Sequence, residues 1–383
     1  MDLWSNFTYF LEDPVNGDQF EQTDRRLTHG LSASQTLNAR TLFDNEIKQT
    51  YGVDIRYDAI DQLGLHNTFE RERIGTTRQD QVDQLGAGAF YEVHVQWNPR
   101  LKTVAGLRGD FVHADVDSQL AANSGNADDF MANPKLIAIY ALNESSELYA
   151  SGGYGFHSND ARGVTQHIDP IDGSPSEAVD PLVRSIGYEL GIRKEWSLMA
   201  NTSISAWQLD LDSELVYLGD SGSTEASRPS SRKGIEIASY LALKEWLTFD
   251  FDLAFTNARY ANADLAGNEI PGALNRVASA GTNVNLPSGW FGSLRYRHFG
   301  ERPLIEDNTV RSDPFHSFNL RIGYRAERWQ ASIDWMNLLD SDDSDIAYAY
   351  ESRLPGEAPE GIFDHHSHRI PPRALKLHLS VLF

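Results

Sequence analysis

Three histidines within four residues form the densest group of potential metal ligands in this sequence. His365, His366 and His368 follow directly after Asp364, and imidazole nitrogens are common ligands of transition metals. A metal ion or a haem-like ligand could therefore bind at this segment. In an extended backbone, however, successive side chains point to opposite sides, so His365 and His366 would diverge. The alternative is a solvated loop without a role in binding.

A second polar run stands at residues 157–162. His157, Ser158, Asn159, Asp160 and Arg162 offer hydrogen-bonding groups of several kinds, which suits the recognition of a polar ligand at the mouth of a pocket. Ser, Asn and Asp also satisfy backbone groups in turns, so these residues could equally anchor the loop that follows. The prolines of that loop predict a structured, lid-like excursion rather than a helix.

The sequence contains none of the common enzyme motifs. We find no Gly-x-Ser-x-Gly elbow, no phosphate-binding loop and no His-Glu-x-x-His helix. The chain has no Cys, which excludes thiol catalysis, disulfide bonds and cysteine-ligated metals. Its formal net charge of -22 argues against nucleic-acid binding, because phosphates would be repelled. We therefore expect a protein that is not an enzyme, binds no nucleic acid and carries no cofactor.

The elements that must position these groups are strands. Apolar and polar residues alternate with period two in about seventeen segments, most clearly at 247–255, and we find no convincing helix. The mean hydropathy is -0.44, and no run of about 18 apolar residues predicts a membrane helix. The last segment, 373–383, has a length that suits a tilted strand across a bilayer, which takes about 9–11 residues. One face of it carries Leu375, Leu377, Leu379, Val381 and Phe383. The pattern predicts an all-β protein.

The connections between these segments alternate between short and long. Short joins are expected near residues 59–61, 98–100, 143–145, 195–197, 244–246, 287–289 and 326–328. Long ones are expected at 75–83, 117–133, 157–183, 219–231, 260–272, 300–315 and 339–372. Tryptophans recur beside the short joins. Tight turns at one rim, polar loops at the other and an aromatic girdle are typical of an antiparallel transmembrane β-barrel of the outer membrane. We expect the short turns and the C-terminus in the periplasm, and the long loops outside the cell.

Charged residues occupy the face of the strands opposite the apolar one. Arg295, Arg297 and Arg321 are examples. The lumen of such a barrel is polar, so the simplest interpretation is a hydrated interior whose charges pair with one another and with a domain that fills the barrel. The alternative is a path for an anionic ligand such as a ferric siderophore.

The count of strands predicts a barrel that is larger than this chain. Outer-membrane barrels generally have an even number of strands, whereas the count here is odd. The first strand, at residues 3–11, also begins without a lead-in or a visible signal peptide. Either one strand is miscounted or part of the wall is absent, which would leave free strand edges at 3–11 and 373–383.

Several stretches resemble the barrel of TonB-dependent outer-membrane receptors. They are Gly52-Val-Asp-Ile-Arg-Tyr-Asp58, Gly106-Leu-Arg-Gly-Asp110, Asn133-Pro134-Lys135, Glu147-Leu-Tyr-Ala-Ser-Gly-Gly-Tyr-Gly-Phe156, Asn337-Leu-Leu-Asp340 and Pro372-Arg373 with the terminal strand. The first is similar to a family strand that ends at a periplasmic turn. After Phe156 the sequence departs from the family's Phe-Arg-Ala-Pro pattern. The order and spacing of these stretches carry the resemblance, which covers essentially the whole chain.

The resemblance implies a barrel of about 22 strands filled by an N-terminal plug, whose short box contacts the energising protein TonB. It implies outer-membrane lipid as surroundings and active uptake of a small ligand, such as an iron chelate. It also implies that the terminal residues Leu377, Leu379, Val381 and Phe383 are read by the barrel-assembly machinery. No plug or box is recognisable, so residues 1–383 are expected to form a single β-barrel domain with 16–17 strands of the larger barrel. A passive, porin-like channel and a soluble extracellular β-protein are the alternatives.

Overall fold

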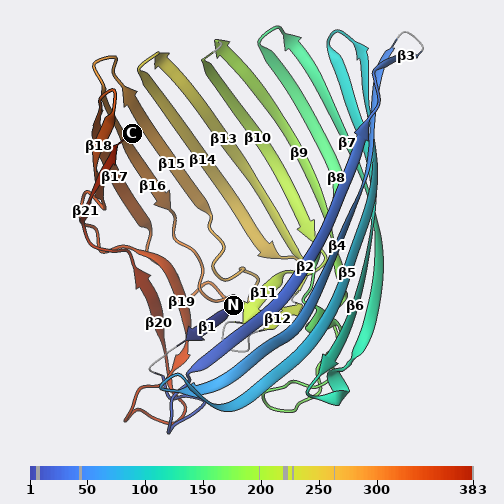
Figure 1. Cartoon of the computed structure of the whole chain (residues 1–383), viewed down its shortest axis with the longest axis vertical. Helices are drawn as coiled ribbons and strands as arrows, with labels where there is room; N and C mark the ends of the chain where they lie inside the picture. Colours follow the sequence, from blue (N-terminus) through green and yellow to red (C-terminus); the bar gives the residue numbers. More distant parts are fainter. Residues whose placement is uncertain are drawn as a thin grey trace.

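The computed structural model describes residues 1–5, 9–42, 45–197, 199–218, 223–226, 228–262 and 264–381. Most of them belong to one antiparallel sheet of 17 strands, as the alternating pattern predicts (Figure 1). Helix in this described part is limited to one α-helical turn, α1 (Ala161–Val164), and one 3-10 turn, η1 (Ala121–Asn123). Neither is long enough to cross a membrane.

The hydrogen-bond ladders give the order of the strands in the sheet. That order is β1 (Asp2–Ser5), β2 (Phe20–Thr36), β4 (Asn45–Phe69), β5 (Glu72–Asn98), β6 (Leu101–Ser118), β7 (Gly125–Asn143), β8 (Ser146–Ser158), β9 (Leu182–Ser197), β10 (Ala200–Leu211), β13 (Ser230–Lys244), β14 (Leu247–Tyr260), β15 (Arg276–Asn285), β16 (Trp290–Phe299), β17 (Phe315–Arg325), β18 (Trp329–Met336) and β21 (Ala374–Val381). β3 (Arg40–Leu42) follows β2 beside β4. Two hairpins stand apart, β11 (Leu215–Leu218) with β12 (Ser223–Ala226) and β19 (Ser344–Ser352) with β20 (Ile362–Arg369).

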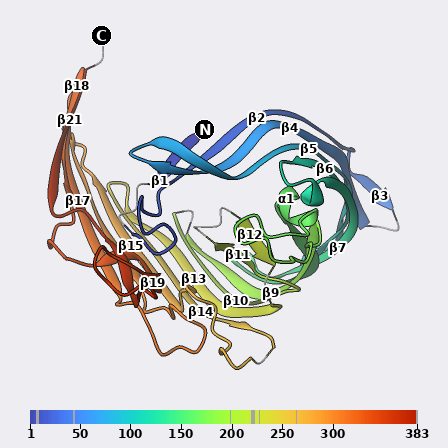
Figure 2. The same cartoon turned by 90° about the horizontal axis from the view of Figure 1, so that it is seen from below.

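The sheet is a strongly curved wall that does not close. β2 and β3 pair with successive parts of β4 on the same side of it. The 17 strands therefore occupy 16 positions across the sheet. Among the described strands, β21 pairs only with β18, and β1 pairs only with β2. Figure 2 shows the resulting gap between β21 and the edge formed by β1 and β2. The expected strand number and the free edges are confirmed.

The two rims of the wall differ as the loop pattern predicts. Turns of two to four residues join β5 to β6, β7 to β8, β13 to β14, β15 to β16 and β17 to β18. The opposite rim carries α1, the two hairpins and the longer loops, and β21 ends at the rim of the short turns (Figure 1). The alternation therefore arises from a chain that passes up and down one wall.

Tryptophans line the short-turn rim on the outer face. Trp97, Trp196, Trp246, Trp290 and Trp329 flank these turns and are 38–65% exposed. Two of them use the same cross-strand contact, because their indole N–H groups donate to a Thr hydroxyl six residues later at 2.9 and 3.0 Å. Amphipathic rings at this level suit the border between lipid and water.

One pair of strands is longer than its sequence pattern predicts. The short join expected at 59–61 and the long loop expected at 75–83 are both wrong, since β4 and β5 run through them. The strands meet instead at Glu70 and Arg71, whose φ angles are 50° and 67°. Register shifts interrupt the ladder at Ile60/Leu63, Leu65/His66 and Asn67/Thr68. Each shift breaks the two-residue period, so this extended segment has the sequence pattern of a loop. The stretch at 52–58 accordingly lies in mid-strand and not before a turn.

The first strand is shorter than expected. β1 covers Asp2–Ser5, and residues 9–11 do not belong to a strand, so the expected extent of 3–11 is wrong. The Asp18 carboxylate accepts hydrogen bonds from the backbone N–H groups of Leu11, Glu12 and Asp13 at 2.8–3.0 Å. Such side-chain acceptors compete with a strand ladder and bend the chain.

The last strand is confirmed, with its apolar face outward. Leu375, Leu377 and Leu379 of β21 are 62, 80 and 72% exposed, and Val381 is 50% exposed. Phe383 lies outside the described residues. Exposure of this extent on consecutive same-face residues is what a lipid-facing strand requires.

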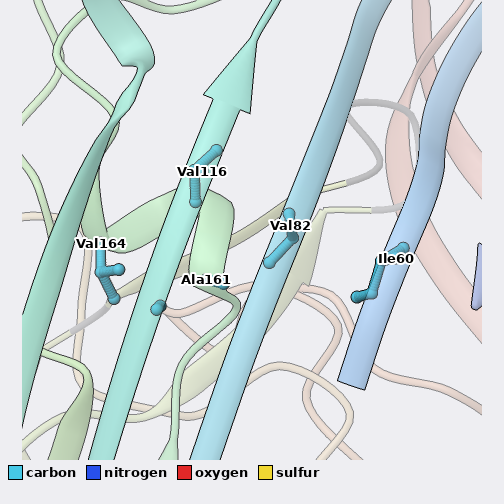
Figure 3. Packing of buried hydrophobic residues seen from close by; sticks show 6 residues of the cluster. Ile60, Val82, Val116, Ala161 and Val164 are labelled. Atoms are coloured by element: carbon cyan, nitrogen blue, oxygen red, sulfur yellow. The ribbon is translucent and has the colours of Figure 1, made fainter. Parts of the chain in front are cut away.

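Apolar packing inside the wall is concentrated at the loop rim. Ile60, Val82 and Val116 of three adjacent strands pack against Ala161 and Val164 of α1 (Figure 3). All five side chains are buried. Figure 2 shows α1 on the concave side of the sheet. The loop that contains α1 is therefore folded back against the inner face of the wall.

Candidate functional site

Loop 159–181, between β8 and β9, supplies the centre of the candidate site. Asp160 caps α1, because its Oδ1 accepts a hydrogen bond from the backbone N–H of Arg162 at 2.9 Å. The Arg162 guanidinium donates to the same carboxylate at 2.9 and 3.0 Å. Burial acts to raise the pKa of Asp160, but the hydrogen bonds and charge of Arg162 outweigh it and hold that pKa below its ordinary value. The ionised pair fixes the start of the loop.

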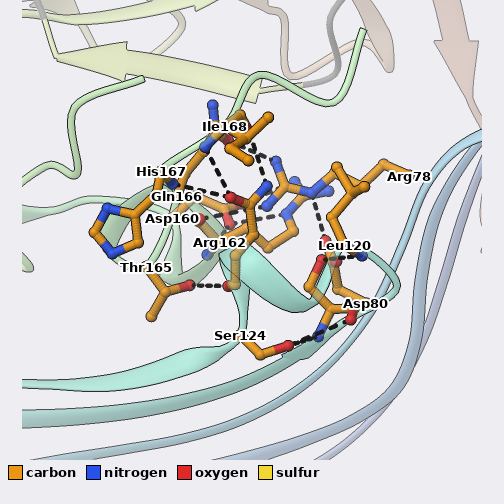
Figure 4. Close-up of polar contacts among 12 residues, drawn as sticks. Arg78, Asp80, Leu120, Ser124, Asp160, Arg162, Thr165, Gln166, His167 and Ile168 are labelled. Atoms are coloured by element: carbon orange, nitrogen blue, oxygen red, sulfur yellow. Dashed lines mark hydrogen bonds and ion pairs between the residues drawn. The ribbon is translucent and has the colours of Figure 1, made fainter. Parts of the chain in front are cut away.

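A second ion pair lies beneath α1 on β5 (Figure 4). Arg78 and Asp80 are hydrogen-bonded to each other, with side chains only 4% and 0% exposed. Arg78 also donates to Gln166 Oε1 at 3.0 Å and to the carbonyl of Arg162 at 3.3 Å. Removing one partner of a buried pair leaves an uncompensated charge, which is costly. This network therefore holds the loop to the wall and does not offer a free charge to a ligand.

Asn123 connects the middle of the loop to the β6–β7 connection. Asn123 is buried, with 1% of its surface exposed. Oδ1 accepts hydrogen bonds from the backbone N–H groups of His167 and Ile168, both at 2.9 Å, and Nδ2 donates to the Ile168 carbonyl at 2.8 Å. The Thr165 hydroxyl donates to the Asn123 carbonyl at 2.9 Å. The loop is thus anchored at its start and at its middle.

The residues of the polar run predicted at 157–162 do not converge on one site, because several of them bond to the loop itself. Asn159 closes the base of the loop, since its Nδ2 donates to the Asp180 carbonyl at 2.7 Å. His157 has a buried Nε2 without a hydrogen-bond partner in the described part of the chain. Ser158, the last residue of β8, is exposed. Asn159, Asp160 and Arg162 act as loop anchors, and ligand binding by this run stays a prediction.

Carboxylates neutralise two of the predicted cations on the inner wall. Arg295 of β16 reaches across Gly281 of β15 to Asp250 of β14. A Cβ atom at Gly281 would lie 2.5 Å from Arg295 Nη1 and 2.6 Å from Asp250 Oδ1, so the two side chains would have to shift for a larger residue there. Arg321 donates to Asp334 at 2.5 and 2.6 Å. These contacts agree with the interpretation of wall charges that pair with one another.

Arg297 differs from these two arginines. It is exposed on the same inner face and forms no ion pair within the described residues. Its guanidinium is therefore available to an anionic ligand. Further round the wall, a cavity of about 480 Å³ is lined by Glu92, Arg108 and Lys135 among others, but these charges are paired.

The three histidines of the last long loop do not meet. All three lie on β20, which pairs with β19 in a loop-rim hairpin. His366 stacks on Tyr350 with ring centroids 3.8 Å apart, and its Nδ1 lies 2.8 Å from the Tyr9 hydroxyl. His368 Nδ1 lies 2.7 Å from Asp345 Oδ1, and His365 alternates to the other face. In the described ranges, no group of three or more His, Cys, Asp or Glu side chains could hold a metal ion. Metal binding here stays an untested prediction.

Loops from distant parts of the chain are joined at this rim. Arg228 lies over the ring of Tyr260 at 4.1 Å and donates to Glu306 Oε2 at 2.6 Å, which links three loops. At the two ends of the sheet, the backbone N–H of Phe10 donates to the Arg353 carbonyl at 2.8 Å. Contacts between loops therefore hold parts of this rim in place.

Sequence reasoning missed Arg78, Asp80 and Asn123, the residues that hold loop 159–181. Arg78 and Asp80 fall in the segment expected to be a loop, and Asn123 contacts residues more than forty positions away. The two-residue spacing of Arg78 and Asp80, which puts both on one face of a strand, is the signal that could have found the pair.

Comparison with known protein families matches residues 2–338 to the family described as "TonB dependent receptor-like, beta-barrel". Among solved structures, the chain is similar to the ferric yersiniabactin uptake receptor FyuA from Yersinia pestis, with a TM-score of 0.70 and 15% identity over 95% of this chain and 55% of that chain. It is similar to the ferric-catecholate import receptor Fiu from E. coli K12, with a TM-score of 0.69 and 14% identity over 94% and 55% of the chains. For the ferric citrate transporter FecA the TM-score is 0.71 with 13% identity over 95% and 55%.

At these identities the likeness to solved structures establishes the fold alone. The chain spans about half the length of the solved structures that it matches.

Proposed function

We propose a function from the premise that this chain belongs to the family of TonB-dependent receptor β-barrels. Barrels of this family lie in the outer membrane and serve transport rather than catalysis. We infer that the intact protein binds a scarce nutrient at the loop rim and takes it up with energy supplied through TonB. In this proposal the loops face the outside of the cell, the short turns face the periplasm, and residues 1–383 form one β-barrel domain.

The unequal rims are the observation that supports this proposal most. A recognition surface needs polar groups on loops that are held in place. Loop 159–181 meets that need, because ion pairs and Asn123 anchor it inside the wall. The other rim has only short turns where the described strands meet. The strongly exposed leucines of β21 disfavour a soluble extracellular protein, which would rarely leave such a face uncovered.

An anionic metal chelate is the ligand class that we propose. The matched solved structures are named for ferric yersiniabactin, ferric catecholates and ferric citrate. The chain as a whole carries a net charge of -22 and repels anions at long range. Attraction must therefore come from local cations, for which Arg297 is the best placed on the inner wall. Arg295 and Arg321 lie on the same face, although both are paired.

Uptake by whole cells tests this function. Gram-negative cells without their own ferric-chelate receptors would produce the complete gene product and receive radioactive iron as ferric citrate or as a ferric catecholate. We expect uptake of at least one chelate, and its loss in cells without TonB. Uptake that continues without TonB would indicate a passive channel instead. Failure to take up either chelate, with the protein present in the outer membrane, would contradict an iron-chelate ligand.

Arg297→Ala tests the proposed ligand contact. Loss of one charged hydrogen bond costs about 1.5 kcal/mol or more, so the concentration for half-maximal uptake should rise about tenfold. Arg328→Ala, at an exposed residue of the β17–β18 turn, removes the same charge from the opposite rim and should leave uptake unchanged. Equal uptake by both variants would exclude Arg297 from the binding site.

The histidines of β20 need a separate measurement. Because His366 and His368 are engaged with Tyr9 and Asp345 and His365 faces the other way, we expect the triple change to Ala to leave the Cu²⁺ affinity of the purified protein unchanged. Isothermal titration with Cu²⁺ measures it. A clear loss of affinity would establish the metal site that the sequence pattern predicts.

A further inference from the structure

The outer face of the wall carries exposed cations at the loop rim that have no carboxylate partner. Lys233 of β13 and Arg276 of β15 are exposed, and neither forms an ion pair within the described ranges of the chain. Cations of the inner face that do have a carboxylate partner are Arg56, Arg108, Arg295 and Arg321. Like Arg297 of the inner face, Lys233 and Arg276 therefore keep their charge available to a partner outside this chain.

The strand register places both cations on the side that faces lipid. Directly opposed residues of an antiparallel ladder point to the same face. Arg276 is opposite Phe255 of β14, and Phe255 is opposite Ile235 of β13. Phe255 and Ile235 are 46% and 51% exposed on the outer face. Lys233 lies two residues from Ile235 and therefore shares its face. Both cations stand where the apolar band ends toward the loops.

The tilt of the strands brings these cations to a similar level. Lys233 lies two ladder positions nearer to the loops than Arg276, and His298 of β16, which is opposite Ala278, lies two positions nearer to the short turns. The strands are tilted, as Figure 1 shows. The shift of these residues along successive strands is in the direction that offsets this tilt, so the residues lie at a similar height on the wall. His298 stacks on His316 of β17 with ring centroids 4.5 Å apart, and the Tyr296 hydroxyl lies 2.9 Å from His316. Polar and aromatic groups thus continue the row to β17.

Over β5, β6 and β7 the outer face of this rim carries negative charge. Exposed carboxylates there are Asp83 of β5, Asp115 and Asp117 of β6, and Asp128 of β7. Beside the cations, Asp210 of β10 points outward, and both of its oxygens accept hydrogen bonds from Gln208 at 2.9 and 3.1 Å. Within the described residues, Lys233 and Arg276 lie over β13 and β15, while Arg184 of β9 is a further exposed cation of this face and lies over the Tyr154 ring. The protein has a net charge of -22.

We propose that Lys233 and Arg276, with His298 and His316 at the edge of the row, bind the phosphate groups of an anionic lipid in the outer leaflet. Cations at a membrane surface attract anionic headgroups, and the exposed apolar side chains below them would contact the acyl chains. A free phosphate ion would match the charges but would gain nothing from that apolar band. The inference rests on the proposed orientation, with the loops outside the cell.

Retention of lipid by the purified protein tests this site. The complete protein would be extracted from outer membranes in a mild nonionic detergent, and native mass spectrometry would count the phosphorylated lipids bound to each folded barrel. Lys233→Ala/Arg276→Ala should lower the retained lipid about tenfold or more, since each cation adds to the attraction. Arg100→Ala/Arg328→Ala removes the same charge from two exposed turns of the other rim and should retain the wild-type amount. Equal retention by both double variants would overturn the proposal.

Three further measurements test the charge dependence of the site, its preference for lipid over free phosphate, and the orientation of the protein. Lys233→Glu/Arg276→Glu should retain even less lipid, and wild-type retention by this variant would also overturn the site. Inorganic phosphate at millimolar concentration should not displace the lipid, and full displacement would assign the site to free phosphate. Ala178→Cys in loop 159–181, in a background without other cysteines, should react with an impermeant maleimide on intact cells. Failure to react would contradict the orientation and with it the proposed function, whereas normal reaction with unchanged lipid retention would refute the lipid site alone.

Discussion

Removal of the side-chain amide of Asn123 should release loop 159–181 from the wall. In Asn123→Ala the two N–H groups of residues 167 and 168 lose their acceptor at 2.9 Å, and the Ile168 carbonyl loses its donor at 2.8 Å. The Asn123 carbonyl and its hydrogen bond from Thr165 do not depend on the side chain. The change therefore isolates the contribution of one amide to the position of the loop.

The magnitude follows from the three backbone groups that lose a partner in these part-buried hydrogen bonds. Each buried polar group left unsatisfied costs about 1–3 kcal/mol, and three groups are affected. Water that enters the space left by the amide recovers part of this cost, so we expect about 3 kcal/mol in total. At about 1.4 kcal/mol for each factor of ten, the population of the detached loop should rise by roughly two orders of magnitude.

Hydrogen exchange of the protein in detergent measures this change. The backbone amides of residues 167 and 168 should exchange about a hundredfold faster in Asn123→Ala, while those of the β5–β6 ladder should keep their protection. Asn126→Ala is the matched control, because Asn126 is exposed three residues further along and makes no side-chain contact with the loop among the described residues. Unchanged protection of residues 167 and 168 in Asn123→Ala would refute the reasoning.

Three other changes test the same region. Arg78→Ala leaves the carboxylate of Asp80 buried without its cation, so urea titration should show a loss of about 3–5 kcal/mol; Arg78→Ala/Asp80→Ala should recover much of it, and equal losses would contradict a buried ion pair. Val116→Ala removes two carbons from the cluster beneath α1 and should lower the free energy of unfolding by about 2 kcal/mol in the same assay, whereas no change would mean that the cluster is loosely packed. Because the pKa of Asp160 in the folded protein lies below its ordinary 3.8, the anchoring it provides is complete above that pH and is lost as the pH falls through the lowered pKa. Pepsin should therefore cut loop 159–181 faster only below pH 3.8, and Asp160→Asn should remove this step.

The segment 75–83 shows where reasoning from the sequence stops being sufficient. Within the bilayer one face of a strand meets lipid and the other meets water, so alternation is enforced there. β4 and β5 extend further toward the loops, where part of their inner face packs against α1, and three register shifts interrupt the alternation. Their composition then resembles a loop, although the ladder continues to Phe69 and Glu72. The sequence therefore predicts the number of strands correctly, because alternation holds within the bilayer. It predicts the ends of β4 and β5 incorrectly, because the register shifts break the alternation there.

The sequence predicted several residues of the candidate site, but not which residues they contact. The run at 157–162 was identified as either ligand-binding or anchoring, and the structure shows the anchoring contacts of Asn159, Asp160 and Arg162. The loop is also held by Arg78 of β5. Arg78 donates to Gln166, which is 88 positions away in the chain, and to the carbonyl of Arg162, which is 84 positions away. No local pattern encodes such a contact.

The amino-acid sequence alone determined that this chain is a wall of antiparallel strands with short turns at one rim, polar loops at the other and an apolar outer face. It could do so because side chains alternate with period two, and the lipid and water on the two faces select opposite residue types. Only the tertiary structure decided that loop 159–181 folds inward over Arg78 and Asp80, that several cations of the inner wall are neutralised, and that Lys233 and Arg276 share the outer face near the loop rim. These features depend on the curvature and register of the sheet, which bring together residues that are distant in the chain.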